Sequence, residues 1–577
     1  MATASSRPLA TPLPVPAAAP RPVRQALSRD DLVMRAGLGL LVLWLALSVV
    51  LPLWALLAKA FSGPAGEFVG LANFAAYLAT PALSTSLANS LLIAAVSTVI
   101  CVALAFGYAW ALTRTCLPAK GLFKAIAAIP ILAPSLLPAI ALVYLFGNQG
   151  FARWALFGHS IYGPIGIVIG EVFWTFPHAL IIVTTALATA DARLYEAAAA
   201  LKASRSRIFW TVTLPGARYG LISATFVVFT LVITDFGVPK VIGGSFNVLA
   251  VDVYKQVVGQ QNFQMGAVVG LVLLLPALFS FLVDRLVQRR QAALLSARAV
   301  PLVPTPDPLT DRLALLFCSI VAFAILVILG TAIFASLATF WPYDLTPSLK
   351  NYDFDNMDGG GWESYRNSLE MAALTAIFGT AIIFGGAWLV EKTRRFELVR
   401  GLAQLLALLP LAIPGLVMGL GYIFFFVEPS NPFHFLYGSM AILVICTIAH
   451  FYSVAHLTAV TALKQLDPEF ESVSASLKVP LWRTFFKVTV PVCLPAILDI
   501  ALYLFLNAMT TVSALVFLYS PRTQLASIAV LNMDDAGDIA PAAAMAVMIF
   551  LTSAVVRGLY GLVTRGFLAR TQAWRRR

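Results

Sequence analysis

The fold is decided by the stretch Asp191-Ala-Arg-Leu-Tyr-Glu-Ala-Ala-Ala-Ala-Leu-Lys202, which is followed thirteen residues later by Pro215. A second stretch, Asp467-Pro-Glu-Phe-Glu-Ser-Val-Ser-Ala-Ser-Leu-Lys478, is followed by Pro491 after the same interval. The first is a strong helix former with small side chains, and a proline would end such a short helix. A device that occurs twice at one spacing indicates a chain built from two similar halves.

Other matching residues support the duplication. Asn89-Ser-Leu recurs as Asn367-Ser-Leu, and Pro134 recurs as Pro414. The offsets of such pairs lie between 276 and 280 residues, which indicates one ancestral unit used twice. Because each unit holds an even number of spans, we expect the halves to share one orientation. A pseudo-two-fold axis along the membrane normal would then relate them, with a solute path at their interface.

Hydropathy places both halves in a membrane. The chain has 577 residues, of which 60% are hydrophobic and 11% charged, whereas soluble domains carry about 25% charged residues. A spanning helix needs about 20 mostly apolar residues. Blocks of this kind run near 36–61, 88–113, 121–147, 161–187, 216–238, 264–286, 313–341, 368–390, 401–427, 437–461, 492–519 and 540–564. Continuous blocks argue against a β-barrel. We therefore expect an all-α polytopic transmembrane helix bundle of two parallel six-helix repeats.

The basic residues predict the orientation. With the N-terminus inside, only seven of the 39 Lys and Arg residues fall in outside segments: Lys59, Arg153, Lys240, Lys255, Lys350, Arg366 and Arg522. The positive-inside rule requires such a bias. We expect a multi-pass membrane protein with both termini in the cytoplasm. The bias also accounts for the net charge of +12 without a nucleic-acid partner.

Extended segments are expected to flank and join the halves. Residues 1–35 are rich in Pro, Ala and Arg and predict a disordered cytosolic tail. The first half is predicted at 36–286 and the second at 312–564. A Pro-rich cytosolic linker, 287–311, joins them, and 565–577 form a basic cytosolic tail.

Two inside loops, 190–215 and 466–491, are longer than most others. Asp191 and Asp467 are expected to cap a short helix in each loop. Pro215 and Pro491 are expected to end that helix and to lie in the first turn of the next span. A single helix of this kind is typical of an amphipathic segment resting on the membrane surface. Its presence in the same loop of both halves favours a docking surface for another protein.

The loops resemble the EAA loop of bacterial ABC-importer permeases, in which Glu-Ala-Ala is followed by a glycine and then by Ile-x-Leu-Pro. In the first loop, Lys202 stands at the glycine position and the other matching residues are Glu196, Ala197, Ala198, Val212, Leu214 and Pro215. The second loop is degenerate, with Lys478 at the glycine position and Glu471 one position early; it aligns Ser472, Val473, Ser474, Val488, Val490 and Pro491. The resemblance implies that each loop is a coupling helix that docks into an ATPase subunit.

Over residues 36–564 the chain is similar to fused permeases of the ferric-iron and 2-aminoethylphosphonate importer groups. The run Thr234-Asp-Phe-Gly-Val-Pro-Lys-Val-Ile-Gly-Gly244 looks most like the aminoethylphosphonate group. The resemblance implies a type I ABC-importer permease for a phosphonate, or alternatively for ferric iron or another small solute. It implies a place in the bacterial inner membrane, with two copies of a cytosolic ATPase and a periplasmic solute-binding protein as partners.

No cofactor or metal site is expected in the chain itself. It contains no Gly-x-x-x-x-Gly-Lys-Ser/Thr sequence and so cannot bind ATP as a P-loop does; hydrolysis would occur on a separate subunit. Its five histidines and five cysteines show no ligand spacing, and no catalytic constellation indicates an enzyme. The alternative class is a secondary transporter of the major-facilitator type, which also has two parallel six-helix halves.

Polar residues near the outer ends of spans are the candidates for a solute path. Asp235 lies toward the outer end of the fifth span, and its repeat equivalent is Thr511, beside Thr510 and near Asn507. Ionisable residues inside spans are costly and usually face a cavity, so a polar ring at this level would line the path. Hydrogen bonding between helices is the alternative role. Glu171 and Asp499 are weaker candidates near span ends.

Overall fold

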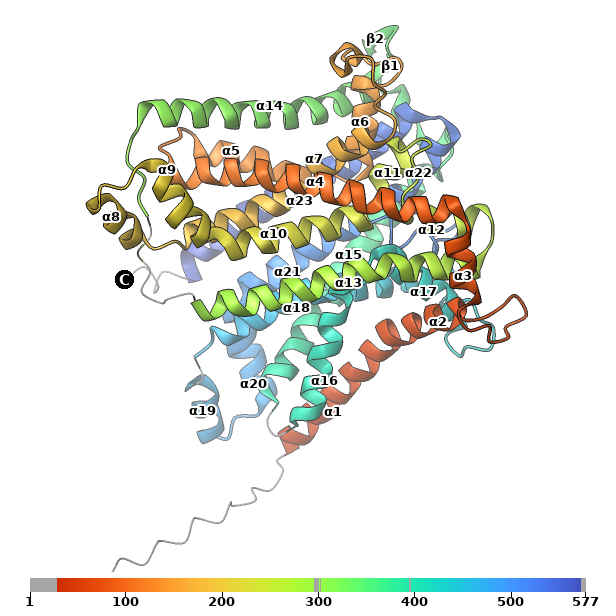
Figure 1. Cartoon of the computed structure of the whole chain (residues 1–577). Coiled ribbons are helices and arrows are strands. Elements are labelled where there is room, and N and C mark those ends of the chain that lie inside the picture. Colours follow the sequence, from red (N-terminus) through yellow and green to blue (C-terminus); the bar gives the residue numbers. More distant parts are fainter. Residues whose placement is uncertain (1–28, 295–299, 301, 394–395, 468, 572–577) are drawn as a thin grey trace, which may run out of the picture.

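The protein is a bundle of long helices that run roughly side by side (Figure 1). The computed structural model describes residues 29–294, 300, 302–393, 396–467 and 469–571. Within these residues the only sheet is a two-stranded antiparallel hairpin of β1 (Ala338–Phe340) and β2 (Asp344–Pro347). The predicted all-α class is confirmed.

The two halves contain corresponding series of helices. The first comprises α1 (Arg29–Leu45), α2 (Leu51–Ala60), α3 (Ala72–Ala79), α4 (Pro81–Arg114), α5 (Lys120–Ala128), α6 (Leu136–Phe146), α7 (Pro164–Ala188), α8 (Ala192–Ala200), α9 (Arg205–Ile208), α10 (Leu214–Thr234), α11 (Gly237–Ile242), α12 (Leu249–Tyr254) and α13 (Phe263–Leu294). The second comprises α14 (Pro308–Leu337), α15 (Gly361–Lys392), α16 (Glu397–Leu408), α17 (Gly415–Phe426), α18 (Met440–Lys464), α19 (Glu469–Ser476), α20 (Leu481–Thr484), α21 (Val490–Thr510), α22 (Ala526–Ala536) and α23 (Ile539–Thr571).

Ten helical segments among the described residues are long and apolar enough to span a membrane, or up to twelve if two bent pairs count as spans. The continuous spans predicted at 121–147 and 401–427 are wrong. Lys120–Leu132 and Leu136–Phe146 meet at 103°, and Glu397–Ala412 and Gly415–Phe426 meet at 113°. Pro134 and Pro414 lie at these bends. Proline lacks an N–H and disfavours helix in the residue before it, which breaks the ladder there.

Several helix ends also differ from the prediction. The tail predicted over 1–35 is wrong for 29–35, because α1 begins at Arg29. The blocks 216–238 and 492–519 are interrupted, since α10 ends at Thr234 and α21 at Thr510. Helix α23 continues through Thr571, beyond the predicted start of a tail at 565. Residues 1–28 and 572–577 and linker residues 295–299 and 301 lie outside the described residues.

The halves exchange their first helices. Helix α2 packs against α17 of the second half and α1 packs against α16, while α14 packs against α5 and α6 of the first half. The contact of α2 with α17 is close, since the Tyr422 hydroxyl donates to the Ser48 carbonyl at 2.7 Å. A Cβ on Gly421 would lie 2.7 Å from the Pro52 carbonyl oxygen. Each half is therefore complete only when the other is present.

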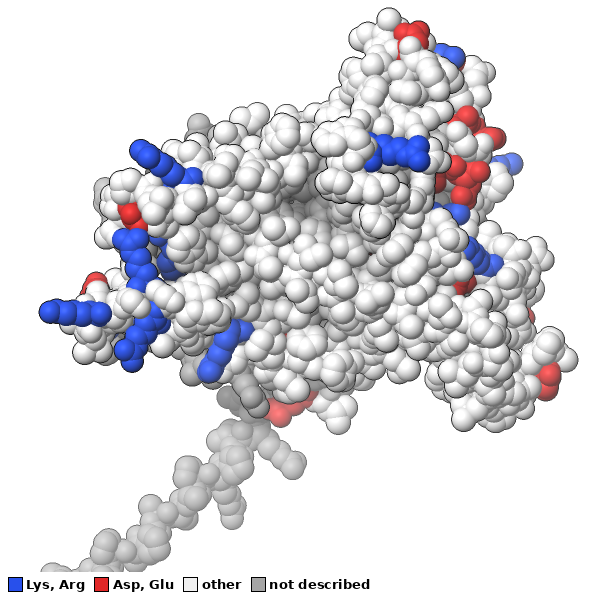
Figure 2. All heavy atoms as spheres, turned by 45° about the horizontal axis from the view of Figure 1, so that its top comes forward, with Lys and Arg blue, Asp and Glu red and all other residues white. Residues whose placement is uncertain are grey.

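Charge separates the two ends of the bundle. Figure 2 shows many Lys and Arg side chains at one end, acidic residues mostly at the opposite end together with further Lys and Arg, and an almost uncharged band between the ends. We call the first the basic end; it carries α8, α9, α19 and α20 (Figure 1). A wide uncharged band is what a bilayer core requires of a protein surface. The bundle is accordingly a multi-pass membrane protein.

The close approach of α2 and α17 can be tested with one methyl group. Gly421→Ala should lower stability by about 1–3 kcal/mol, because the new Cβ meets backbone that cannot easily move. Gly330→Ala in α14 has nothing within 4 Å and should instead be neutral or stabilise the helix by up to about 1 kcal/mol. Thermal unfolding of the detergent-solubilised chain measures both. Equal effects of the two substitutions would contradict the exchange contact.

Candidate functional site

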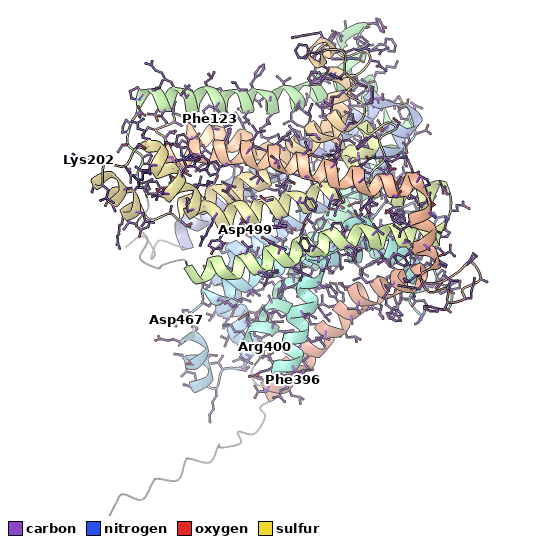
Figure 3. All side chains as sticks on the ribbon, viewed as in Figure 1. Phe123, Lys202, Phe396, Arg400, Asp467 and Asp499 are labelled. Carbon is purple, nitrogen blue, oxygen red and sulfur yellow. The ribbon has the colours of Figure 1, made fainter. Side chains whose placement is uncertain are left out.

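The two long loops form short capped helices at the basic end. In the first, the Asp191 carboxylate accepts a hydrogen bond from the Arg193 N–H at 3.1 Å and begins α8. In the second, the Asp467 carboxylate accepts from the Glu469 N–H at 2.9 Å at the start of α19. The cap predicted at Asp191 is confirmed; the Asp467 contact is of the same kind, next to residue 468, which lies outside the described residues. Figure 3 shows Lys202 and Asp467 at the same end of the molecule.

Each short helix ends in a left-handed residue. Lys202 has φ of 52° and Lys478 has φ of 55°, a conformation that glycine adopts freely and lysine only at a cost. The Ala203 N–H donates to the Ala198 carbonyl and the Val479 N–H donates to the Ser474 carbonyl, both at 3.0 Å. Both loops therefore keep a left-handed turn of the kind that glycine favours, although lysine stands at the position where the EAA loop has glycine.

The prolines stand second in α10 and α21, but they do not end the short helix and do not lie in the first turn of the following span, contrary to the prediction. Leu214 and Val490 begin α10 and α21, with Pro215 and Pro491 next. Helix α9, a π-helical turn at Phe209–Thr213 and α10 form one continuous segment from Arg205 to Thr234. The second loop repeats this with a π-helical turn at Phe485–Thr489. The short helix instead ends at its left-handed lysine.

The short helices expose small and apolar side chains. Glu196 and Ala197 are exposed and Ala198 is half-buried, while Leu201 is 82% exposed at the C-terminal end of α8. In the second loop, Ser472 is exposed; the side chain of Glu471 lies outside those described. Exposed apolar side chains beyond the uncharged band mark a site for another protein; in these loops they are Leu194, Leu201, Trp210, Phe470, Val473, Leu477, Trp482 and Phe486.

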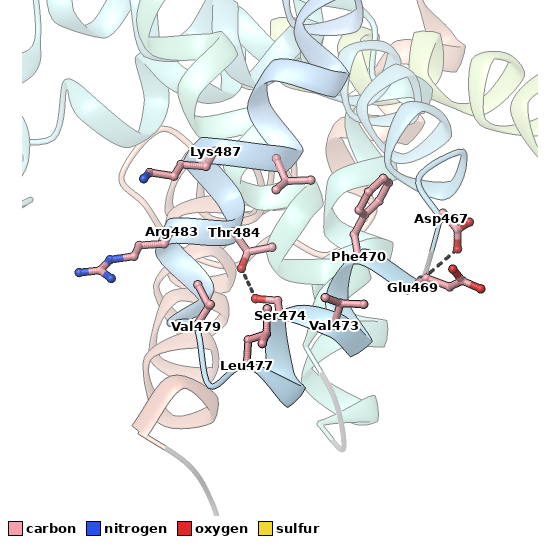
Figure 4. A pocket seen from close by; sticks show the side chains of 11 residues that line it. Asp467, Glu469, Phe470, Val473, Ser474, Leu477, Val479, Arg483, Thr484 and Lys487 are labelled. Carbon is pink, nitrogen blue, oxygen red and sulfur yellow. Dashed lines mark hydrogen bonds between the residues drawn. The ribbon is translucent and has the colours of Figure 1, made fainter. Parts of the chain in front are cut away.

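A pocket separates α19 from α20 in the second loop (Figure 4). Its volume is about 640 Å³, and its lining combines apolar residues of α19 with Arg483 and Lys487 on the facing segment. The hydroxyls of Ser474 and Thr484 form a hydrogen bond across it. In the first loop, Tyr195 donates to Thr213 at 3.2 Å. Both short helices are thus joined to the base of the following span by one hydroxyl contact.

Each loop is also joined to the segment that opens the other half. The Asp30 carboxylate, in α1, accepts from the Leu481 N–H at 3.1 Å. Asp307, before α14, forms an ion pair with Arg205. Hydrogen bonds from Thr310 and Arg205 hold the pKa of Asp307 below its ordinary value. The two carboxylates occupy equivalent positions in the repeat, and sequence reasoning missed both.

Only the first loop contacts the linker among the described residues. The Ala192 N–H donates to the Val300 carbonyl at 2.9 Å, and the Val300 N–H donates to the Asp191 carboxylate at 3.4 Å. Val300 belongs to the segment that joins the two halves. The start of the first short helix is therefore hydrogen-bonded to the linker, and the two loops differ in this contact.

The candidate path residues form two separate polar groups. Asp235 follows α10, and its carboxylate accepts from the Val238 N–H at 2.8 Å. In the second half, the Asn507 carbonyl accepts from the Thr511 N–H at 3.0 Å, and Thr510 and Asn507 donate to carbonyls of their own helix α21. Asp235 is also hydrogen-bonded to Ser135 and Glu171 of the first half, and the hydrogen bonds of the described residues do not join it to the other three.

An ion pair at the opposite end joins the halves. Lys240, after α10, lies 2.7 Å from the Asp535 carboxylate of α22. Burial raises the pKa of neighbouring Asp534 to about 6; the Asp535 charge adds to this shift and Lys240 opposes it. Sequence reasoning missed this pair, because nothing in the spacing shows which outer residues meet.

Comparison with known proteins identifies the repeat. A family model described as binding-protein-dependent transport system inner membrane component matches residues 103–293 and again 378–568. The ferric transport system permease protein FbpB of Actinobacillus pleuropneumoniae is 29% identical over 82% of this chain and 70% of its own length. The Fe(3+)-transport system permease protein FbpB 2 of Haemophilus influenzae is 23% identical over 90% and 96%. The molybdenum transport system permease protein ModB of Mycobacterium tuberculosis is 30% identical over 30% and 67%.

The left-handed turn of the first loop gives a test. Lys202→Gly should stabilise the loop by up to about 1 kcal/mol, because the left-handed conformation costs a non-glycine residue about 1–2 kcal/mol and the flexibility of glycine offsets part of the gain. The neighbouring Ala203→Gly, at a residue without positive φ, should loosen the loop instead. Amide hydrogen exchange over residues 197–208 reports the change. Faster exchange in both variants would contradict the assigned turn.

Proposed function

The chain belongs to the family of binding-protein-dependent transport system inner membrane components, and we propose that it forms the whole translocation path of an ATP-driven importer. Two copies of the family's domain lie in one chain, so one chain supplies what two subunits would otherwise supply. Family membership overturns the alternative of a major-facilitator transporter. The chain is a transport subunit, and we place ATP hydrolysis on a separate protein.

The observation that carries the proposal is the pair of short helices α8 and α19. Both are capped, end in a left-handed residue and lie at the basic end. Their exposed residues include Glu196, Ala197 and Ser472. ATP hydrolysis on another subunit can act on the path only through a contact, and these helices supply matching contact surfaces. We therefore assign the ATPase-coupling role to residues 190–215 and 466–491.

The remaining partners follow from this orientation. The basic end would face the cytoplasm, with both termini on that side. Two docking helices in one chain would bind two ATPase copies. The loops 239–263 and 520–539 at the opposite end would receive a solute-loaded periplasmic binding protein.

We propose ferric iron as the solute, with 2-aminoethylphosphonate as the second candidate. Ferric iron is supported by the names of two relatives that match over 82% and 90% of the chain. The phosphonate is supported by the run from Thr234 to Gly244, which resembles that group. Transport assays that offer a binding protein loaded with either solute would separate the candidates.

Assembly gives the first test of the proposed function. The chain should co-purify with two ATPase subunits and no second copy of itself, because the exchanged helices already complete both halves. Mass measurement of the detergent-solubilised complex would show this stoichiometry. A complex that holds two copies of the chain would refute it.

A bulky residue on α8 gives the second test. Ala198 is half-buried, so Ala198→Trp should push the helix out of its seat in the ATPase and abolish transport. Glu196→Lys should weaken docking only partly, since an exposed ion pair contributes about 0.2–1 kcal/mol, and Ser472→Lys should act less still. ATPase capture and vesicle transport are the measurements.

The control for this test is Ala76→Trp, an exposed alanine on the short helix α3 at the opposite end. It should leave ATPase capture unchanged. Membrane insertion of every variant is checked first. A normally inserted Ala198→Trp chain that transports at the wild-type rate would show that residues 191–215 do not couple.

A further inference from the structure

Three chain segments of the first half meet where helices break. Asp235 lies between α10 and α11, and Ser135 precedes α6 at the bend. A Cβ on Gly237 would lie 2.2 Å from the Ser135 hydroxyl oxygen, so these two breaks are in direct contact. Glu171, in α7, lies beside Asp235. Two carboxyl groups and a hydroxyl therefore meet at membrane depth.

The two carboxyl groups differ in access. Glu171 is fully buried, and neither of its carboxyl oxygens has a hydrogen-bond partner of ordinary geometry. Asp235 is partly exposed and is held by the Val238 N–H and the Ser135 hydroxyl. Among the described residues, no Lys or Arg side chain acts on either carboxyl group. Asp235 is thus the less buried of the two carboxyl groups.

The second half shows that the fold does not need these acids. The equivalents of Glu171 and Asp235 are Thr447 and Thr511, at the same offset of 276 as the N-caps of the loops. The same helices pack around threonines there. A buried carboxyl pair without a cationic side chain beside it is costly, so its occurrence in only one of two similar halves indicates a ligand rather than a structural role.

We propose that Glu171 and Asp235 form a transient site for a hard metal cation that crosses the membrane domain. This proposal rests on the proposed function and assigns the solute's chemical class to residues. Carboxylate and hydroxyl oxygens are the ligands that hard cations prefer. Ser135 and main-chain carbonyls freed by the two helix breaks would complete the shell.

The site is suited to weak, transient binding of a cation rather than to tight binding. The described residues include no group of three His, Cys, Asp or Glu side chains that could hold a metal. A translocation site must bind firmly enough for entry and weakly enough for exit. An oxyanion such as a phosphonate would meet two acids, and among the described residues no guanidinium or ammonium group acts on either of them.

Terbium luminescence tests the site in the full chain. Tb3+ is a trivalent ion that prefers oxygen ligands, and Trp174 lies one turn from Glu171 on α7 and can excite it. The chain in nanodiscs should give a saturable signal that Ga3+ displaces. Glu171→Gln and Asp235→Asn keep side-chain shape and should weaken binding about tenfold or more. Thr447→Val, the equivalent position in the second half, and Asp284→Asn, a buried acid of α13, should retain it.

The outcomes separate this proposal from the proposed function. An equal signal in all variants would mean surface binding only and would overturn the site. Wild-type binding of radiolabelled methylphosphonate that Glu171→Gln abolishes would also overturn it, in favour of an anion. ATPase capture needs no metal, so its success alongside either result would leave the permease function standing while the cation site fails.

Discussion

Backbone that is broken at membrane depth must be covered by protein, and the rest of the structure depends on this constraint. The bends at Pro134 and Pro414 free carbonyl and amide groups that lipid cannot hydrogen-bond. Helices α14 and α23 of the second half pack on the first bend, while α2 and α13 of the first half pack on the second. The exchange of first helices therefore makes the bent spans tolerable, because each bend is covered by helices of the other half.

The same exchange connects the docking helices to the membrane interior. Asp30 opens α1 and is bonded to the second loop, while Asp307 precedes α14 and is paired with the first. Each loop thus holds the first helix of the opposite half, which packs on a bend-forming segment of the half that carries the loop. We expect displacement of either loop to move both a spanning helix and a bend through these direct contacts, so no long chain of coupled side chains is required.

The sequence predicted the structural features that depend on residue type and spacing along the chain. Long apolar blocks, the repeat offsets and the caps at Asp191 and Asp467 all follow from residue type and spacing. The bends escaped prediction because Pro134 and Pro414 lie inside continuous apolar blocks, where hydropathy does not register a change of direction. The exchange escaped because similar apolar faces do not show which half they pack on. The left-handed lysines show the converse, since tertiary structure imposes a conformation that their side chains disfavour.

Joining the halves in one chain allows them to become unlike. Two identical subunits would have to carry every polar residue twice. Here the positions equivalent to Glu171 and Asp235 in the second half hold threonines instead. The loops diverge in the same way, because only the first keeps Glu196 with two alanines and is contacted by linker residue Val300. In the cation site proposed above, a single carboxyl pair avoids placing four acids around one path, where a cation would be bound too tightly to be released. The asymmetry of the halves would thus let this duplicated chain bind its proposed solute weakly and release it.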